Sequence, residues 1–382
     1  MAQRPIRVLQ VTNSLNFGGL ERLIVDLCLG LDRDRFTPMV ACLKYKGNLS
    51  PELEQAGVPV IPLNEDVDPK RRYRTFRALQ RLIREQGIDV VHTHNTGPLM
   101  DVLMARLTQL RGVRWVHTDH NRIHWPGPLK YRVVERVASM LIHDFVAVSP
   151  DARDNLVRYE KIPFGRIRII DNGIAVDRFK VDAQQTKAFV QEINADAFSH
   201  RVGFVGMHRP KKGLATLLQA FPAVLAKFPN AGLIVAGGGP LEDAHQAEAE
   251  ELGISDHVRF LGRRSDVPDI LAAMDVYVLP SESEGLPIGL LEAMAAARPI
   301  VATAVGAVPR VLGDGEYGRL VQPCSPDALA EAINGLLADP EARQRMAERA
   351  RERVVAEFSI SRTVDEYAAL YQQAAPRRPC DH

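Results

Sequence analysis

The sequence predicts an α/β protein of two domains, each a parallel β-sheet with helices on both faces. The chain has 382 residues, which is more than one ordinary domain holds. Short, nearly continuous apolar segments alternate with segments of helical periodicity, which is typical of parallel sheets covered on both sides. This alternation pauses near residues 167–180 and then restarts. We therefore predict Rossmann-like domains at residues 1–172 and 173–360.

The strands are predicted at the short apolar segments. In the first half these are residues 6–12, 37–43, 58–63, 89–94, 113–118 and 144–149. In the second half they are residues 201–206, 231–239, 257–262, 275–280 and 299–304. Helices are expected between them, a last helix at about residues 361–373, and a disordered tail at residues 375–382. Ligands bind at the carboxyl ends of parallel strands, so the candidate site is a cleft between two facing domains.

Composition and charge restrict the class of protein. Hydrophobic residues make up 46% and charged residues 25%, as in soluble globular proteins. No apolar run approaches the ~18 residues of a membrane span. The four cysteines show no CxxC spacing and the start resembles no signal peptide, so we expect a cytoplasmic protein with reduced thiols. Residues 1–172 carry a net charge of +7 and residues 173–382 carry −6, which indicates that one domain faces an acidic partner.

The segment SESEGLPIGLLEAM, residues 281–294, follows a predicted strand and opens a helix. Gly285 permits a ligand to approach the backbone, and Pro287 suits the first helical position. A helix amino terminus at Glu284 favours a phosphate and places Glu292 roughly 12 Å along the axis. The two acids would then hold the ends of an extended ligand through its sugar hydroxyls. The alternative is a capping acid and a solvated helix acid.

A basic loop follows another predicted strand, in VGFVGMHRPKKG at residues 202–213. Arg209, Lys211 and Lys212 lie between the strand and the next helix. Cations at the carboxyl end of a strand suit a diphosphate. The alternative is a solvated basic turn.

A glycine pair, Gly18 and Gly19, lies between the first strand and the first helix. The spacing is not GxGxxG, which disfavours NAD binding, yet the pair permits close approach of a phosphate or an acceptor. The alternative is an ordinary tight turn.

Histidines gather after two neighbouring strands, in the segments HTHN and HTDHNRIHW. A metal cluster is one interpretation, but strand alternation turns His117 and His120 to different faces. We expect instead that a single histidine, His120, lines the site. Asp32 and Asp34 have the Asp-x-Asp spacing of metal-dependent sugar transferases, but they lie at the far end of the first helix and indicate a turn.

An arginine-rich helix is predicted at residues 69–86. Its apolar residues fall on one side and its arginines lie mostly elsewhere. This pattern fits a solvated helix packed on the sheet. It also fits a patch that binds an anionic membrane surface.

Taken together, these motifs resemble the family-4 retaining glycosyltransferases of GT-B fold, over nearly the whole chain. The most specific part is Glu284, seven intervening residues and Glu292, followed by PIVATAVGAVPRVL and GRLVQP. The resemblance implies a nucleotide-sugar donor held mainly by the C-terminal domain and a sugar or lipid-linked acceptor held mainly by the N-terminal domain. It also implies a last helix that returns to the N-terminal domain, and neither an essential metal nor another cofactor.

The resemblance also implies roles for individual residues. The phosphate-binding cations fall on Arg209 and Lys212, although many relatives place the arginine where this chain has Met207. Glu284 falls near the donor sugar and Glu292 on the ribose. The remaining positions implied by the family are the donor loop at Gly285, Leu286 and Pro287, the glycine pair Gly18 and Gly19, the sugar-side His120, and the base pocket at Gly262 and Arg263.

The function that follows is transfer of a sugar to an acceptor hydroxyl with retained anomeric configuration, in polysaccharide or glycolipid assembly. Within the family, the HTHN and TDHNR segments look most like bacterial exopolysaccharide-type enzymes. Nucleic acid is not an expected partner. The alternatives are a sugar-nucleotide epimerase or hydrolase of GT-B type, and a catalytically silent nucleotide-sugar-binding protein.

Overall fold

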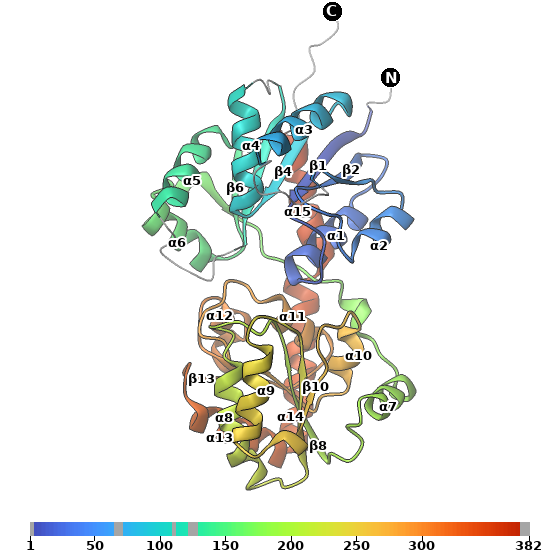
Figure 1. Cartoon of the computed structure of the whole chain (residues 1–382), viewed down its shortest axis with the longest axis vertical. Helices are drawn as coiled ribbons and strands as arrows, with labels where there is room; N and C mark the ends of the chain where they lie inside the picture. The colour runs from blue at the N-terminus through green and yellow to red at the C-terminus, as the bar shows by residue number, and fades with distance from the viewer. Residues whose placement is uncertain (1–3, 65–71, 109–111, 121–128, 375–382) are drawn as a thin grey trace, which may run out of the picture. The chain divides into compact units, whose positions relative to one another are not determined.

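The computed structural model describes residues 4–64, 72–108, 112–120 and 129–374. The chain divides into two compact units (Figure 1). Unit 1 comprises the residues up to Gly173 and those from Ile360 onward, and unit 2 comprises Ile174–Ser359. The predicted disordered tail, residues 375–382, lies outside the described residues.

Unit 1 contains a parallel sheet of seven strands in the order β3-β2-β1-β4-β5-β6-β7. Strand β1 is central, and its residues Val8 and Leu9 are fully buried on opposite faces. The strands are β1 (Ile6–Thr12), β2 (Phe36–Cys42), β3 (Val60–Pro62), β4 (Val90–His94), β5 (Arg114–Asp119), β6 (Asp144–Ala147) and β7 (Ile167–Ile169).

Helices cover both faces of this sheet, as predicted. Helices α3, α4, α5 and α6 pack on one face, and α1 and α15 pack on the other, with α2 against α1. The helix α15 buries Tyr367 and Tyr371 against the strands, so the last helix belongs to unit 1. The helices are α1 (Gly19–Gly30), α2 (Ser50–Gln55), α3 (Arg72–Glu85), α4 (Thr96–Thr108), α5 (Leu129–Leu141), α6 (Pro150–Glu160), η2 (Phe164–Arg166) and α15 (Ile360–Ala374).

Unit 2 has a six-stranded parallel sheet in the order β10-β9-β8-β11-β12-β13. Its strands are β8 (His200–Val205), β9 (Ala231–Ala236), β10 (Val258–Phe260), β11 (Val276–Leu279), β12 (Ile300–Thr303) and β13 (Arg319–Val321). Helices α8, α9 and α13 form an apolar core with one face. The helices are η3 (Val176–Phe179), α7 (Ala183–Glu192), α8 (Leu214–Leu225), α9 (Glu242–Glu251), η4 (Ser255–His257), α10 (Val267–Ala272), α11 (Ile288–Ala295), α12 (Val308–Val311), η5 (Gly313–Gly315), α13 (Pro326–Ala338) and α14 (Pro340–Glu357).

Each sheet reverses its strand order once, between β1 and β4 in unit 1 and between β8 and β11 in unit 2. Ligands of doubly wound sheets bind at such switch points, beyond the carboxyl ends of the strands. The loops that follow β8 and β11 are therefore neighbours. These are the loops that carry the predicted cations and carboxylates.

Two strands, β7 and β13, were not predicted. Each has three residues and pairs with a single neighbour, β6 or β12, at the edge of its sheet. So short an element has almost no periodicity of its own, and its neighbour's backbone groups define it. Among the described residues, no helix combines the length and apolar character that crossing a bilayer requires.

Candidate active site

The loops after β8 and β11 pack directly on one another. Gly213 ends the β8 loop with φ of +71°, and a Cβ atom there would lie 1.9 Å from the carbonyl oxygen of Pro280. The Glu282 N–H donates to the carbonyl of Lys211 across the two loops, at 2.8 Å. A side chain at Gly213 would separate the loops, so glycine is required there.

This packing joins Lys212 to Glu284. The Lys212 Nζ donates to Glu284 Oε1 at 2.6 Å, and the Ser281 Oγ donates to the same oxygen at 2.7 Å. The Glu284 side chain is 8% exposed and that of Lys212 is 28% exposed. Among the described residues, every hydrogen bond to Glu284 goes to Oε1. The sequence had placed Lys212 on phosphate and Glu284 on sugar, and had not predicted that they contact each other.

Arg209 differs from Lys212 in its surroundings. It is exposed, and its guanidinium makes no hydrogen bond to any residue that the structure describes. The two cations of the loop are therefore unequal. Lys212 is anchored by a carboxylate, whereas all five N–H groups of Arg209 are available to an anion.

The start of the following helix corrects one prediction. Helix α11 begins at Ile288, and Pro287 precedes it with extended backbone (φ −73°, ψ 113°) instead of occupying the first helical position. The Gly285 carbonyl accepts from the Ala307 N–H at 3.1 Å, so residues 284–287 are held to the loop after β12 and do not continue the helix. Glu292 consequently lies about 6 Å from the helix start, half of the predicted distance, and Glu284 lies outside the helix.

Tyr277 of β11 is a residue that sequence reasoning missed. A Cβ atom on Gly289 of α11 would lie 3.0 Å from the Tyr277 hydroxyl, and this buried hydroxyl has no hydrogen-bond partner among the described residues. Burial raises the pKa of Tyr277, and the charges of Glu292 and Glu284 raise it further. Both acids therefore act on this buried hydroxyl through their charge. Strand alternation in DVYVLP was the available signal, because it turns Tyr277 toward α11.

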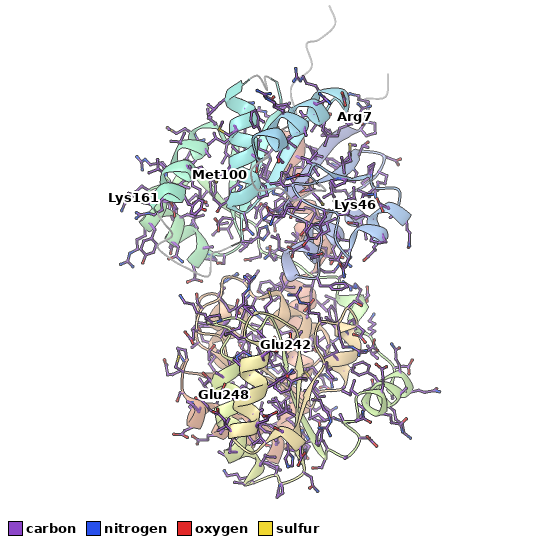
Figure 2. The ribbon with its side chains drawn as sticks, viewed as in Figure 1. Arg7, Lys46, Met100, Lys161, Glu242 and Glu248 are labelled. Carbon is purple, nitrogen blue, oxygen red and sulfur yellow. The ribbon has the colours of Figure 1, made fainter. Side chains whose placement is uncertain are left out.

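The predicted base pocket lies at the turns after β9 and β10. A Cβ atom on Gly238 would lie 2.8 Å from Cγ of Arg263 and 3.1 Å from Oε2 of Glu242. Glu242, which is labelled in Figure 2, is the first residue of α9. The Gly262 carbonyl accepts from the Gly237 N–H at 2.8 Å. Arg263 therefore lies over a glycine turn beside the amino end of α9.

In unit 1, the glycine pair lies at the start of α1. Gly18 is the N-cap and α1 begins at Gly19. The carboxylate of Glu21 folds back over Gly18, 2.2 Å from where a Cβ atom would stand, and burial raises the pKa of Glu21. The group that lies against Gly18 is therefore the Glu21 carboxylate, where the sequence predicted a phosphate or an acceptor.

His120 belongs to a buried hydrogen-bonded chain after β4 and β5. Its Nε2 lies 3.0 Å from His94 Nδ1, and His94 Nε2 lies 2.8 Å from Gln10 Oε1. Because the Gln10 oxygen can only accept, His94 carries its proton on Nε2 and accepts from His120 Nε2–H. Nδ1 of His120 is then an acceptor, and it has no partner among the described residues.

The same chain continues to α15. Gln10 Nε2 donates to the Tyr371 hydroxyl at 2.9 Å, and His92 Nδ1 lies 2.7 Å from that hydroxyl. Burial lowers the pKa of His120 to about 3 and lowers the pKa values of His92 and His94 well below the ordinary range. The histidines are neutral at pH 7. They serve as hydrogen-bonding groups and not as cations.

The metal interpretation of the histidine segments gains no support from the described ranges, where no His, Cys, Asp and Glu side chains gather in threes around a common point. His117 bonds Thr93 Oγ1 at 2.9 Å and packs on Phe145, on the other face from His120. His124 lies outside the described residues. Asp32 forms the predicted turn, with its carboxylate accepting from the Asp34 N–H.

Two family models match the chain. "Glycosyltransferase Family 4" matches residues 17–178, and "Glycosyl transferases group 1" matches residues 185–353. Among curated relatives, the putative glycosyltransferase EpsD of Bacillus subtilis is 28% identical over 323 residues, 81% of this chain and 83% of the relative. D-inositol 3-phosphate glycosyltransferase of Corynebacterium jeikeium is 31% identical over 317 residues, 77% of this chain and 74% of the relative.

Solved structures share the fold. HepE of Anabaena, in complex with UDP and glucose, aligns with a TM-score of 0.84 at 21% identity, over 96% of this chain and all of that one. HepE has also been solved in complex with UDP-glucose. These alignments match an architecture of two parallel-sheet domains.

Proposed function

The chain belongs to the family-4 glycosyltransferases of GT-B fold, and from this we propose that it transfers a sugar from a nucleoside-diphosphate sugar to an acceptor hydroxyl with retained configuration. The observation that carries the proposal is the junction of two loops in unit 2. There the exposed Arg209 and the ion pair of Lys212 with Glu284 stand together at the switch point between β8 and β11. HepE, of similar fold, binds UDP-glucose, which is a donor of this class.

The cations would stabilise the leaving group. As the glycosidic bond breaks, negative charge develops on the diphosphate, and preorganised donors aimed at that charge lower the barrier. Arg209 offers a whole guanidinium, and Lys212 retains two N–H groups beyond the one given to Glu284. Each charge-assisted hydrogen bond contributes roughly 1.5–3 kcal/mol. On this proposal the reaction needs neither a metal nor another cofactor.

Glu284 would position the transferred sugar. Lys212 and Ser281 hold its Oε1, so Oε2 is the oxygen that can accept from a sugar hydroxyl. The leaving phosphate would take the acceptor proton on the same face of the sugar, and no side chain acts as a nucleophile. His120, neutral at pH 7, would offer Nδ1 to a sugar hydroxyl. Glu292, on α11, would bind the ribose.

The acceptor is proposed to be a sugar or a lipid-linked sugar in polysaccharide or glycolipid assembly. On α3, Leu79, Leu82 and Ile83 are buried against the sheet while Arg77 and Arg81 are exposed. Residues 69–71 of the predicted basic helix lie outside the described residues. The exposed arginines would attract an anionic membrane surface, at about 1 kcal/mol each at low salt. Co-sedimentation with anionic and neutral liposomes tests this: equal binding to both would refute it.

The two alternatives are not favoured. Both matching models describe glycosyl transfer, and neither describes epimerisation or hydrolysis. A catalytically silent protein would be free to lose Arg209, Lys212 and Glu284, and this chain has all three.

A thermal-shift panel of UDP-, GDP-, ADP- and dTDP-sugars tests the proposal. A donor at about 100 times its dissociation constant stabilises the protein by about 2.7 kcal/mol, which is a measurable rise of the melting temperature. The best donor is then incubated with candidate acceptors and the product anomer is read by NMR. A product of inverted configuration would refute the retaining mechanism, and release of free sugar at the same rate with and without acceptor would indicate a hydrolase.

A further inference from the structure

Unit 1 has a polar cavity at the amino ends of β5, β6 and β7. Its volume is about 650 Å³, within the range of small-molecule sites. Arg114 opens β5 at this cavity and Asp119 ends that strand, so about 16 Å of strand separates it from His120. Helices α4 and α5, side by side in Figure 1, end at the cavity. The site already described does not include it.

Positive charge dominates its lining. Arg106, Arg114, Arg166 and Arg168 line the cavity, and Asp144 is the carboxylate among its lining residues. With His143 neutral, these groups carry a net charge of +3. Arg168 Nε lies 3.3 Å from Asp144 Oδ1, so that pair is matched. A single lining carboxylate cannot offset the charge of all the lining arginines, so the cavity as a whole stays positive.

Two of these arginines, Arg166 and Arg106, are held in place by backbone carbonyls. Arg166 donates to the carbonyls of Ser139 and Ile142, each at 2.9 Å, and Arg106 donates to that of Val113 at 2.9 Å. A carbonyl fixes a guanidinium without neutralising it. Capping the carboxyl ends of α4 and α5 accounts for part of this arrangement, but each helix end supplies only about half a negative charge.

Capping does not account for Arg114. Its guanidinium is half-buried and makes no hydrogen bond to a described residue. Beside it, His143 Nδ1 accepts from the Trp115 N–H at 3.1 Å, so the neutral ring carries its proton on Nε2 and adds a further donor. Burial lowers the pKa of His143, and Arg114 and Arg106 lower it further. The charges of these arginines thus act on the ring.

An apolar stripe leads to the cavity. Leu129, Val133, Val137 and Met140 follow one another at helical spacing on α5, and their exposed fractions are 70%, 53%, 38% and 67%. Met140 also lines the cavity. The anionic site is therefore continuous with an exposed hydrophobic face.

We propose that this cavity binds a phosphate group, as a monoester or a diester, between Arg114, Arg166 and Arg168. Guanidinium forks match phosphate oxygens. Arg166 is a fork that two carbonyls hold in place, and the unbonded Arg114 beside it has all its N–H groups to offer. The phosphate comes either from a free phosphorylated solute or from a phospholipid headgroup whose chains lie along the α5 stripe. Both sources would occupy the same arginines, but only a phospholipid would also bind through the apolar stripe of α5.

The test follows the His143 ring by NMR in the full chain with labelled histidine, its signal being assigned by its loss in His143→Gln. Inorganic pyrophosphate is added at about ten times an assumed dissociation constant of about 1 mM. Its negative charge should offset the positive charge of the arginines and so raise the pKa of His143. Arg114→Gln should weaken this response at least tenfold. The control Arg33→Gln removes an exposed arginine before β2, three strands away from β5, and should leave the response unchanged. Arg209→Ala should also leave it unchanged, which separates this site from the donor site.

Vesicle flotation then distinguishes the sources. If the phosphate belongs to a phospholipid, two variants should bind phosphatidylglycerol vesicles less: Arg114→Gln, and the double variant Val133→Ser with Met140→Ser. The double variant should keep the pyrophosphate response of His143. For a free solute, pyrophosphate acts on His143 and neither variant changes flotation. The proposal is overturned if wild-type His143 does not respond to pyrophosphate and Arg114→Gln floats like the wild type. Equal melting temperatures of Arg114→Gln and wild type exclude misfolding as the cause of any loss.

Discussion

Lys212 has three N–H groups, and one of them donates to Glu284 at 2.6 Å. A diphosphate would accept hydrogen bonds from the other two, so the diphosphate and the Glu284 carboxylate would compete for the charge of one ammonium group. The Arg209 guanidinium makes no hydrogen bond to a carboxylate among the described residues, so it has no such competition. At the scale of single residues, substituting Arg209 and substituting Lys212 should therefore have different effects on donor binding and on stability.

We expect Arg209→Ala to weaken donor binding without changing the stability of the unliganded protein. Loss of one charge-assisted hydrogen bond at about 1.5–3 kcal/mol corresponds to roughly ten- to hundredfold in affinity. Surface substitutions that break no contact stay within about 0.5 kcal/mol. Calorimetry and thermal melts measure the two quantities, with Arg319→Ala, an exposed arginine of β13, as the control. A lowered melting temperature with intact affinity would make Arg209 structural.

Lys212→Ala should lower both the turnover of the donor and the stability of the unliganded protein. It removes a phosphate ligand, and it leaves the Glu284 carboxylate, only 8% exposed, with Ser281 as its remaining described partner. We expect donor turnover to fall strongly and the melting temperature of the unliganded protein to fall by a few degrees, because about 1 kcal/mol shifts a domain of this size by ~2–4 °C. Unchanged turnover would remove Lys212 from the proposed machinery.

Glu284→Gln and Glu292→Gln should separate sugar recognition from nucleotide recognition. Glu284→Gln should depress turnover and leave the affinity for the bare nucleoside diphosphate unchanged or higher, since Lys212 is then released to the phosphate. Glu292→Gln should weaken donor and bare nucleotide alike, roughly ten- to hundredfold, because both contain the ribose. Calorimetry measures the affinity of both variants for the bare nucleotide and so distinguishes the two roles, with Glu331→Gln on α13 as the control. The reverse pattern would exchange the two roles.

At the scale of elements, α15 completes unit 1. The Tyr371 hydroxyl bonds Gln10 of β1 and His92 of β4, and the Tyr367 hydroxyl bonds Thr118 of β5 at 2.9 Å. Polar groups on the strands, which would be costly to bury alone, are satisfied by the last helix of the chain. The neutral state of the histidines depends on this packing.

These histidines make unit 1 acid-sensitive. The pKa of His120 is about 3 in the folded protein against an ordinary value near 6.5, so below pH 6.5 the unfolded chain binds a proton that the folded chain does not. Stability is therefore complete above about pH 6.5 and falls as the pH drops toward 3, by up to about 1.4 kcal/mol per pH unit for each such histidine.

We expect the urea midpoint to fall between pH 7 and pH 5, and His120→Gln to reduce that fall. His257→Gln, which removes a partly exposed ring in unit 2, is the control. Equal pH dependence in the wild type and His120→Gln would show that His120 is not held neutral in the fold.

At the scale of the whole molecule, we expect activity without a divalent metal. Arg209 and Lys212 supply positive charge beside the proposed diphosphate, which is the role a metal has in other transferases. Turnover should be the same in EDTA and in Mg²⁺ or Mn²⁺. Activity that EDTA abolishes and either metal restores would contradict this.

The sequence by itself determined the two parallel sheets and the loops that carry the candidate site. Nearly continuous apolar strands alternating with helices permit few other arrangements, and residues 281–294 show their glycines, proline and acids within one short segment. These signals are local, because each depends on residues a few positions apart.

Only the tertiary structure decided which groups touch. Lys212 and Glu284 are 72 residues apart and His92 and Tyr371 are 279 apart, so their contacts arise from strand order and helix packing that no periodicity records. The start of α11 at Ile288 was decided in the same way, because the Gly285 carbonyl bonds to Ala307 beyond the next strand. The edge strands β7 and β13 likewise form only where a neighbouring strand offers its backbone groups. Local patterns select the elements, whereas long-range packing sets the distances on which chemistry depends.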